Sequence, residues 1–182
     1  MIPSYQMSGM VDLEALRPDD FDVYDTAVAL SRINRFCGHT AEPYSVAQHA
    51  VVVSYLVPDW AALVALHHDS AEAFIGDMPK HVKLRCPEFI ALERKIEAVI
   101  WDRLLRHQPS EECMKLVKVA DAWALRLEQI NRQHRPVFFE WEGPCQVNHD
   151  VDLEAALDIM GAELVPDEAF ALFCTRHEEL SK

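Results

Sequence analysis

Glycine is scarce in this chain, with only 5 among 182 residues. Neither G-x-G-x-x-G nor G-x-x-x-x-G-K occurs, so the glycine-rich loops that cradle phosphate groups are missing. Nucleotide-binding folds that depend on those loops are therefore excluded. The length predicts a single domain, residues 1–182, which is large enough to bury a full apolar core.

Closely spaced cysteines are also missing. The 5 cysteines are an odd number, and even the nearest two, Cys86 and Cys113, are well separated, which excludes a C-x-x-C zinc site and a dense disulfide framework. The N-terminus has no basic segment followed by an apolar one, as a secretory signal would. The most apolar stretch, residues 50–66, is broken by Pro58 and is too short to span a bilayer. We expect a soluble protein of the reducing cytoplasm, with no membrane partner.

Positive charge is in short supply. The chain has 17 Lys and Arg against 30 Asp and Glu, a net charge of -13. Such a surface repels long nucleic acid, which we exclude as a partner. The protein could still bind a small phosphorylated ligand at a site where a metal ion and a local basic cluster make the electrostatic potential positive. One such cluster follows Asp77, although it also fits a solvated turn; it consists of Lys80, His81, Lys83 and Arg85.

The apolar residues recur with the period of an α-helix, and no alternating strand pair or internal repeat is found. This pattern predicts an all-α helical bundle. Residues 1–20 are expected to be an irregular lead-in, and residues 136–149 an aromatic-anchored loop. Ser45 and Gln48 form a capping-box pattern, and Asp59 is the expected cap of the next helix. The expected helices cover residues 23–38, 46–57, 60–74, 88–107, 110–133, 151–164 and 167–180.

Two polar side chains interrupt the buried stripe of the helix expected over residues 60–74. His68 and Glu72 fall on the same face as the apolar residue Val64. A buried ionisable group needs a partner, because burying it alone costs several kcal/mol. A core histidine paired with a carboxylate would satisfy this requirement, so the feature alone does not establish a functional site. His67 points about 100° away from His68 and is expected to be either a packing residue or one that supports the ligands without binding the metal.

Inward-facing polar residues on two other helices change this interpretation. His49 lies on the apolar stripe that follows Ser45, and Asp121 lies on the stripe formed by Met114, Val117, Ala124 and Glu128. With His68 and Asp69, they make two imidazoles and two carboxylates, the ligands that a divalent transition metal prefers. We therefore predict a metal site formed by His49, His68, Asp69 and Asp121. These ligands suit several ions, among them Co, Mn, Zn, Fe and Mg.

Two competing metal chemistries are excluded by their motifs. No H-E-x-x-H sequence occurs, so the common zinc-protease helix is absent. No Glu-x-x-His pair occurs either, and a ferritin-like di-iron bundle needs two. The metal site must therefore be of another kind.

The histidine, the adjacent His-Asp pair and the distal aspartate resemble the HD-domain metal-dependent phosphohydrolases. The sequence is most similar to the branch of bacterial 5'-deoxynucleotidases and phage dATP triphosphohydrolases. The segments that carry this resemblance are Ser31–Thr40, Tyr44–His49, His68–Pro79 and the sequence around Asp121. The resemblance implies an HD core over about residues 25–130 and self-association into a homo-oligomer, and it does not extend to the last fifty residues. We expect the C-terminal helices over 151–180 to pack on this core.

The resemblance also implies roles for individual residues in hydrolysis of the 5' phosphate ester of a 2'-deoxynucleotide. Glu72 would position water or pass a proton, and Asp77 would protonate the leaving deoxyribose oxygen. Arg35 and Lys83 would bind phosphate. Phe36, where the family commonly carries a tryptophan, would lie near the sugar, with Pro79 also at the substrate. Gln48 stands where an acidic residue is common.

Four functional interpretations remain open from the sequence. The leading one is a deoxynucleoside triphosphate triphosphohydrolase, with dATP as the specific substrate, that releases deoxynucleoside and triphosphate. The close alternative is a 5'-deoxynucleotidase that acts on deoxynucleoside monophosphates. A different class is a non-catalytic module that senses nucleotides, and the fourth is a purely structural α-bundle with paired core charges.

Overall fold

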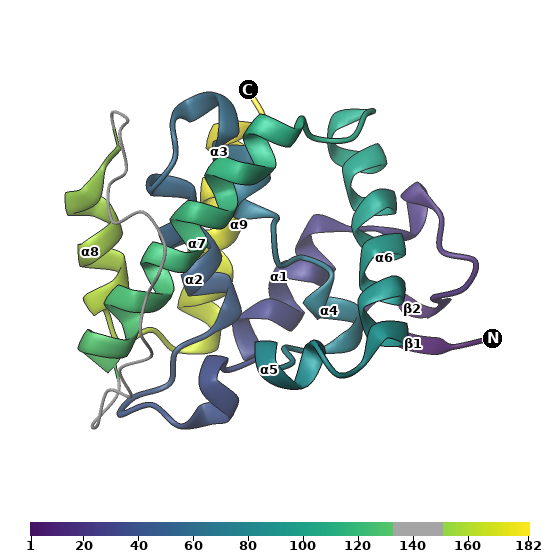
Figure 1. The fold of residues 1–182 in the computed structure, drawn as a ribbon, viewed down its shortest axis with the longest axis horizontal. Coiled ribbons are helices and arrows are strands. Elements are labelled where there is room, and N and C mark those ends of the chain that lie inside the picture. The colour runs from purple at the N-terminus through teal and green to yellow at the C-terminus, as the bar shows by residue number, and fades with distance from the viewer. Residues whose placement is uncertain (133–150) are drawn as a thin grey trace.

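The computed structural model describes residues 1–132 and 151–182, and within them the chain folds almost entirely into helices (Figure 1). The predicted all-α class is confirmed. The helices are α1 (Val23–Arg32), α2 (Val46–Tyr55), α3 (Asp59–Leu66), α4 (Glu72–Ile75), α5 (Lys80–Lys83), α6 (Pro87–Leu105), α7 (Glu111–Arg132), α8 (Leu153–Gly161) and α9 (Pro166–Leu180). Two 3₁₀ turns, η1 (Pro18–Asp20) and η2 (Arg35–Gly38), and two strands, β1 (Pro3–Gln6) and β2 (Gly9–Asp12), complete the described elements.

A small β-hairpin occupies the N-terminus, so the expectation of an irregular lead-in without paired strands is wrong there. Strands β1 and β2 pair antiparallel, with Pro3 opposite Asp12 and Gln6 opposite Gly9. The hairpin is anchored to the helical part by Ser4, whose buried hydroxyl donates a hydrogen bond to the carbonyl oxygen of Phe74 at 2.9 Å. Strands of four residues are too short to give an alternating pattern that can be recognised in a sequence.

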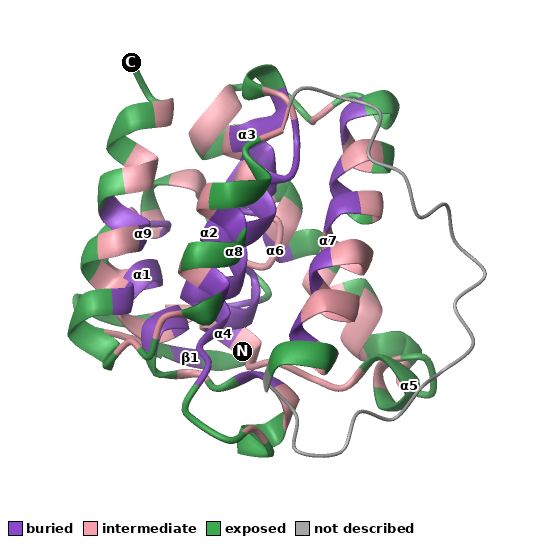
Figure 2. Ribbon diagram, turned by 90° about the vertical axis from the view of Figure 1, so that its left-hand side faces the viewer, coloured by how far each residue is buried: buried purple, intermediate pink, exposed green. Residues whose placement is uncertain are grey.

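Helix α2 lies at the centre of the molecule and is buried on all sides from Val46 to Ser54 (Figure 2). It packs against α1, α3, α7, α8 and α9. A helix that is apolar around its whole circumference is stable only when other elements surround it. Any polar side chain on α2, including His49, is therefore held in the interior.

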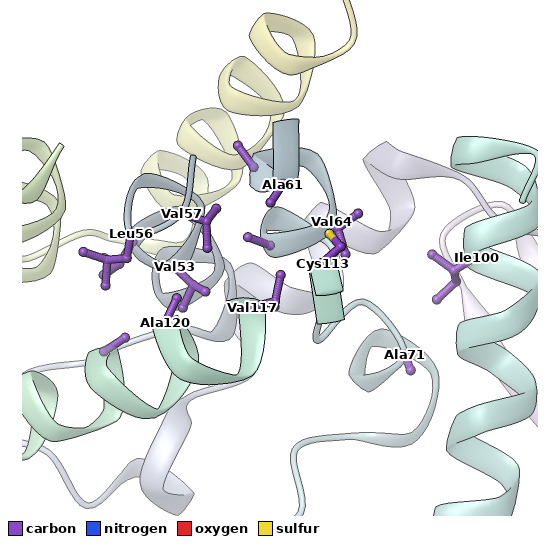
Figure 3. Close-up of a cluster of buried hydrophobic side chains, with 14 of the residues drawn as sticks. Val53, Leu56, Val57, Ala61, Val64, Ala71, Ile100, Cys113, Val117 and Ala120 are labelled. Atoms are coloured by element: carbon purple, nitrogen blue, oxygen red, sulfur yellow. The ribbon is translucent and has the colours of Figure 1, made fainter. Parts of the chain in front are cut away.

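The main core lies where α2, α3 and α7 meet, and Figure 3 shows its side chains. Val53 on α2, Val64 on α3 and Val117 on α7 are all buried there. Each such aliphatic side chain contributes about 1.5–3 kcal/mol by leaving water. Cys113 belongs to the same cluster, and the described cysteines, Cys37, Cys86, Cys113 and Cys174, all carry free thiols. The core thus fixes α7 against α2, which places Asp121 opposite His49.

The helix predicted over residues 60–74 breaks after Leu66. His67 ends α3 with φ -103° and ψ 9°, and residues 67–71 form a turn before the short helix α4. In this turn the amides of Ser70 and Glu72 bond to carbonyls only three residues earlier. Side chains compete with the helical pattern: His67 Nδ1 lies 2.9 Å from Ser70 Oγ, and His68 Nδ1 lies 2.7 Å from the Ala65 carbonyl oxygen. His68 and Asp69 therefore belong to a tight turn and not to a helix face.

Ser45 caps α2 as predicted, but only half of the expected capping box forms. Its hydroxyl accepts a hydrogen bond from the Gln48 amide at 3.1 Å. The Gln48 side chain turns the other way and donates to the carbonyl oxygens of Ile159 and Ala162, at 2.7 and 2.8 Å. Gln48 is completely buried. It therefore joins α2 to the C-terminal end of α8.

Helix α1 ends at Arg32, earlier than the predicted end at Gly38. The chain then forms η2, in which Phe36 and Cys37 both adopt left-handed backbone conformations, with φ of 55° and 53°. Such conformations are unfavourable for residues with a Cβ atom. The turn places Arg35 inside the protein while Cys37 stays exposed.

The other predicted helices are found with small shifts at their ends. Helix α3 begins at Asp59, but the residue before it, Pro58, takes the cap position and makes no side-chain cap bond. The short helix α5 falls in the predicted basic cluster. The loop expected over residues 136–149 lies outside the described residues. Within residues 1–132 and 151–182, no helix combines the length and apolar character needed to cross a membrane.

Candidate metal centre

The four residues predicted to bind a metal lie together. His49 comes from α2, His68 and Asp69 from the turn after α3, and Asp121 from α7. One ligand atom from each of His49, His68 and Asp69 can be chosen so that all lie within 4.8 Å of one another. Asp121 Oδ1 lies 3.2 Å from His49 Nε2 and 3.9 Å from His68 Nε2. His49, His68 and Asp69 thus form a group that can hold a divalent ion, and Asp121 adjoins it.

Both histidines present the same nitrogen to this group. His49 Nδ1 lies 2.5 Å from Glu128 Oε1, and His68 Nδ1 lies 2.7 Å from the Ala65 carbonyl oxygen. Since a carbonyl oxygen only accepts, His68 Nδ1 carries the proton in that contact, and a carboxylate favours the same arrangement at His49. The lone pair of each neutral imidazole is then on Nε2. Both Nε2 atoms are buried and have no hydrogen-bond partner within the described part of the chain.

The positions of these two buried nitrogens test the fit of a cation. Neither forms a hydrogen bond to the described residues, although carboxylate oxygens lie 3.2 Å from His49 Nε2 and 3.1 Å from His68 Nε2. A buried polar atom without a hydrogen bond costs about 1–3 kcal/mol, so native proteins rarely leave two side by side. Here both face the Asp69 carboxylate, with Oδ2 at 3.6 Å from His49 Nε2 and 3.1 Å from His68 Nε2. Neutral imidazoles beside carboxylates suit a divalent transition metal. The donor set therefore fits such an ion.

The charges in the cluster compensate one another strongly. Burial lowers the pKa of His68, but the Asp69 and Asp121 carboxylates outweigh it and raise that pKa well above its ordinary value. Burial likewise opposes ionisation of Asp69, yet the charges of His68 and His49 lower the pKa of this carboxyl to about 2. The same imidazoles hold the pKa of Asp121 well below its usual value against the effect of burial. Protons and a divalent cation therefore compete for these imidazoles.

The role of Glu128 was not predicted from the sequence, in which this residue falls on the apolar stripe of α7. Glu128 is completely buried, and its carboxylate contacts His49, Arg35 and Tyr44. Burial raises the pKa of Glu128, but Arg35 and His49 outweigh burial and lower it. A glutamate seven residues after Asp121 on a buried stripe was the available signal, because an unpaired charge is not tolerated there.

Of the residues predicted to bind phosphate, Arg35 lies beside the metal group and Lys83 is near enough to interact electrostatically with Asp69, and each already has a carboxylate partner. Arg35 is 9% exposed, and its Nη1 lies 3.7 Å from Asp69 Oδ2 while Nε and Nη2 contact Glu128. Its guanidinium carbon lies 5.6 Å from the centre of the Phe36 ring. Lys83 Nζ lies 2.7 Å from Glu93 Oε1 on α6. The Nε edge of Arg35 is thus occupied, which leaves Nη1 as its donor toward the site.

Glu72 and Asp77 are the two predicted proton-handling residues. Glu72 is 5% exposed, and its Oε2 is buried with no hydrogen-bond partner in the described chain. Burial, Asp69 and Asp77 raise the pKa of Glu72 to about 9. Burial also raises the pKa of Asp77, with Arg35 and Lys83 acting in the opposite direction. Pro79 lies two residues further on and is the N-cap of α5.

His67 lies in a different environment from its neighbour His68. Its ring packs edge-on against Phe21 and Phe173, and its Nε2 lies 2.9 Å from His177 Nδ1 on α9. It is 1% exposed and takes no part in the metal group. The interpretation of His67 as a packing residue agrees with these contacts.

A helical protein with one histidine, an adjacent His-Asp pair and a distal aspartate around a single point has the features of an HD-type metal centre. Residues 37–118 match the family model described as 5'-deoxynucleotidase YfbR-like. This match confirms the resemblance to HD-domain phosphohydrolases in the 5'-deoxynucleotidase branch. The matched segment contains His49, His68, Asp69, Glu72, Asp77, Pro79 and Lys83, whereas Arg35, Phe36, Asp121 and Glu128 lie outside it.

The chain is also similar in sequence to individual proteins, two of which are 5'-deoxynucleotidases. The uncharacterized protein YfdR of Escherichia coli is 46% identical over 90 residues, which cover 50% of this chain and 51% of that protein. A 5'-deoxynucleotidase of Vibrio parahaemolyticus is 31% identical over 88 residues, covering 40% of this chain and 45% of its own length. One from Vibrio cholerae is 41% identical over 56 residues, covering 31% and 29%. The chain thus spans about half the length, or less, of the curated relatives it matches.

Proposed function

We propose that this protein is a metal-dependent 5'-deoxynucleotidase that converts deoxynucleoside monophosphates into deoxynucleosides and phosphate. The observation that carries the proposal is the pair of buried Nε2 atoms, of His49 and His68, that form no hydrogen bond within the described chain and face Asp69 beside Asp121. The names of the Vibrio relatives support a monophosphate substrate over the triphosphate expected first. Hydrolysis of dATP stays a prediction, as do the single-domain organisation, the homo-oligomer and the cytoplasmic location.

The proposed ligands are His49, His68, Asp69 and Asp121. A bound divalent ion supplies Lewis acidity, which makes water a better nucleophile and draws charge from the phosphoryl oxygens. In the reaction the bond between phosphorus and the 5' oxygen breaks, a water oxygen joins phosphorus, and the 5' oxygen gains a proton. The protein's own residues must therefore take one proton and deliver another.

Glu72 and Asp77 are the proposed carriers of these protons. The raised pKa of Glu72, about 9, keeps its carboxyl protonated in the metal-free protein. A divalent cation bound nearby would favour the carboxylate, whose buried Oε2 has no partner in the described chain and could then orient water and accept its proton. Burial raises the pKa of Asp77, which favours a carboxyl that still holds a proton to give to the 5' oxygen. Arg35 Nη1 and Lys83 Nζ would bind the phosphate, and Phe36 and Pro79 would contact the rest of the nucleotide.

The charge around the site supports one phosphate group better than three. Arg35 is neutralised by Glu128, and Lys83 is neutralised by Glu93. Glu97, on the same helix as Glu93, adds a further acidic group: burial, Glu93 and Asp69 raise its pKa to about 7. A triphosphate brings several more negative charges than a monophosphate and would meet these carboxylates.

A substrate panel tests the proposal. Deoxynucleoside mono-, di- and triphosphates would each be incubated with Co, Mn, Mg, Zn or Fe, and the released phosphate, diphosphate or triphosphate would be separated by ion chromatography. We expect phosphate from the monophosphates and little release from the others. Release of triphosphate from dATP without turnover of monophosphates would restore the triphosphohydrolase interpretation. A His49→Ala variant provides the inactive control.

A further inference from the structure

Glu128 occupies an unusual position for a charged residue. It lies on α7, outside the segment that matches the family model, and its side chain is completely buried. A buried carboxylate needs close partners, and Glu128 has three of them on three different parts of the chain. They are Arg35 in η2, Tyr44 before α2 and His49 on α2.

The two oxygens of Glu128 serve different neighbours. Oε1 accepts a hydrogen bond from the Tyr44 hydroxyl at 3.0 Å and lies 2.5 Å from His49 Nδ1. Oε2 accepts from Arg35 Nε at 3.1 Å and lies 3.1 Å from Arg35 Nη2. One carboxylate therefore contacts both a proposed metal ligand and a proposed phosphate-binding residue.

Each contact fixes an orientation that the proposed chemistry requires. The contact with His49 Nδ1 keeps the proton on that nitrogen and turns Nε2 toward Asp69 and Asp121. The contacts with Nε and Nη2 of Arg35 hold its guanidinium by one edge, so that Nη1 is directed to the side where Asp69 lies. Stability alone is a weak explanation for this network, because apolar residues of similar size usually replace buried ion pairs without loss.

We propose that Glu128 is a positioning residue that orients His49 for metal binding and Arg35 for phosphate binding at the same time. It acts through these two side chains and does not touch the substrate. The inference rests on the proposed function for its phosphate part only. The part that concerns His49 can be tested by the affinity for a metal ion, which is measured without any substrate.

The test compares Glu128→Gln and Glu128→Asp with the wild-type protein. Glutamine has the same shape but only one acceptor oxygen, so it cannot accept from both His49 and Arg35. Aspartate keeps the charge but is one methylene shorter. Tyr44→Phe is the matched control, because it removes one hydrogen bond to the same carboxylate and leaves the other contacts in place. Titration calorimetry would measure Co²⁺ binding to the metal-free proteins and inorganic phosphate binding at saturating Co²⁺, with thermal melting as the measure of stability.

We expect both Glu128 variants to bind Co²⁺ about 10–100-fold more weakly, the usual effect of losing a partner that orients a metal ligand. Phosphate binding should also weaken about tenfold even when Co²⁺ saturates the site, while Tyr44→Phe changes both constants by less than about threefold. Unchanged Co²⁺ and phosphate binding in a folded Glu128 variant would overturn the proposal. Failure of both variants to fold would also overturn it, since Glu128 would then be a requirement of the core.

These measurements separate this inference from the proposed function. If wild-type protein binds Co²⁺ and the Glu128 variants bind it more weakly, the metal part holds whether or not any nucleotide is hydrolysed. If the wild type hydrolyses monophosphates and the variants bind Co²⁺ and phosphate normally, the proposed function stands and the inference about Glu128 fails.

Discussion

His67 Nε2 lies 2.9 Å from His177 Nδ1, which connects the turn after α3 to the C-terminal helix α9. The contact continues on both sides, to Ser70 Oγ at 2.9 Å from His67 Nδ1 and to Ser181 Oγ at 3.3 Å from His177 Nε2. In a hydrogen bond between two imidazoles one nitrogen donates and the other accepts, so the accepting ring is neutral and at most one of the two carries a positive charge. The turn that carries His68 and Asp69 is therefore held in place by α9.

This pair is expected to contribute a loss of stability in acid. Burial, His177 and His68 lower the pKa of His67, and burial lowers that of His177 against the effect of Glu178. Below about pH 6.5 the unfolded chain therefore binds protons that the folded state excludes. The stabilisation is complete above that pH and is lost progressively as the pH falls. In metal-free protein the raised pKa values of His49 and His68 act in the opposite direction. The contribution of the pair is therefore measured as a difference in urea unfolding between wild-type and variant protein from pH 8 to pH 5.

Between pH 8 and pH 5, a His177→Asn variant should become more stable relative to the wild type, because the amide can still donate to His67 but does not titrate. His107 is exposed and contacts only a neighbouring carbonyl oxygen, so His107→Gln is the matched control and should keep the wild-type trend. Identical pH dependence in all three proteins would contradict this account.

Glu72→Gln should separate catalysis from binding. Loss of a group that accepts a proton in the transition state lowers kcat by about 10²–10⁴-fold, while Co²⁺ and nucleotide binding stay within about threefold of the wild type. Steady-state rates and calorimetry check both. Glu88→Gln, at an exposed position on α6, should keep full activity. A wild-type protein that binds nucleotide and never turns it over would instead indicate a nucleotide-sensing module.

Divalent metal should stabilise the folded protein. At a concentration 100 times the dissociation constant, a ligand that binds only the folded state adds about 2.7 kcal/mol. The melting temperature with Co²⁺ should therefore exceed that with EDTA. His68→Asn retains a donor near the Ala65 carbonyl oxygen but lacks Nε2, so it should lose this shift. If no ion tested changes the melting temperature of the wild-type protein, the interpretation as a purely structural bundle would be favoured.

Gln48→Glu should destabilise the protein by about 1–3 kcal/mol, the cost of leaving buried polar groups unpaired. A carboxylate cannot donate to the carbonyl oxygens of Ile159 and Ala162, which Gln48 Nε2 now contacts. Gln108 offers the matched control, since its Nε2 donates to the Ala98 carbonyl oxygen at an exposed site. Gln108→Glu should change the free energy of unfolding by less than about 0.5 kcal/mol. Equal losses in the two variants would show that burial of Gln48 is not the cause.

Arg106→Gly should stabilise the protein by about 0.5–1 kcal/mol, because glycine adopts the left-handed conformation without a steric penalty. Arg106 ends α6 with φ 63° and is exposed. Arg103→Gly, three residues earlier inside the last turn, should have the opposite effect and cost about 1 kcal/mol. Chemical denaturation of the two variants checks the sign, and stabilisation by both or by neither would refute the explanation.

The sequence predicted the helices well where they are long and have one apolar face, as α6, α7 and α9 do. It also predicted that His49, His68, Asp69 and Asp121 lie close together, as they do in the structure. For His68 the helix face on which this prediction was based is wrong, since His68 and Asp69 lie in a turn. It did not predict the break at His67, which depends on side-chain contacts with Ser70 and the Ala65 carbonyl oxygen. It could not assign partners to Glu128 or Gln48 either, since these partners lie 79 to 114 residues away along the chain.

Asp121 and Glu128 stand seven residues apart on α7, almost two full turns, so both project from the same side of one rigid rod. A single residue inserted or deleted between them would rotate one carboxylate by about 100° relative to the other. His49 would then keep its contact with Glu128 at Nδ1 or its contact with Asp121 at Nε2, but not both. Between these two carboxylates, α7 should therefore tolerate only insertions or deletions of about a whole helical turn.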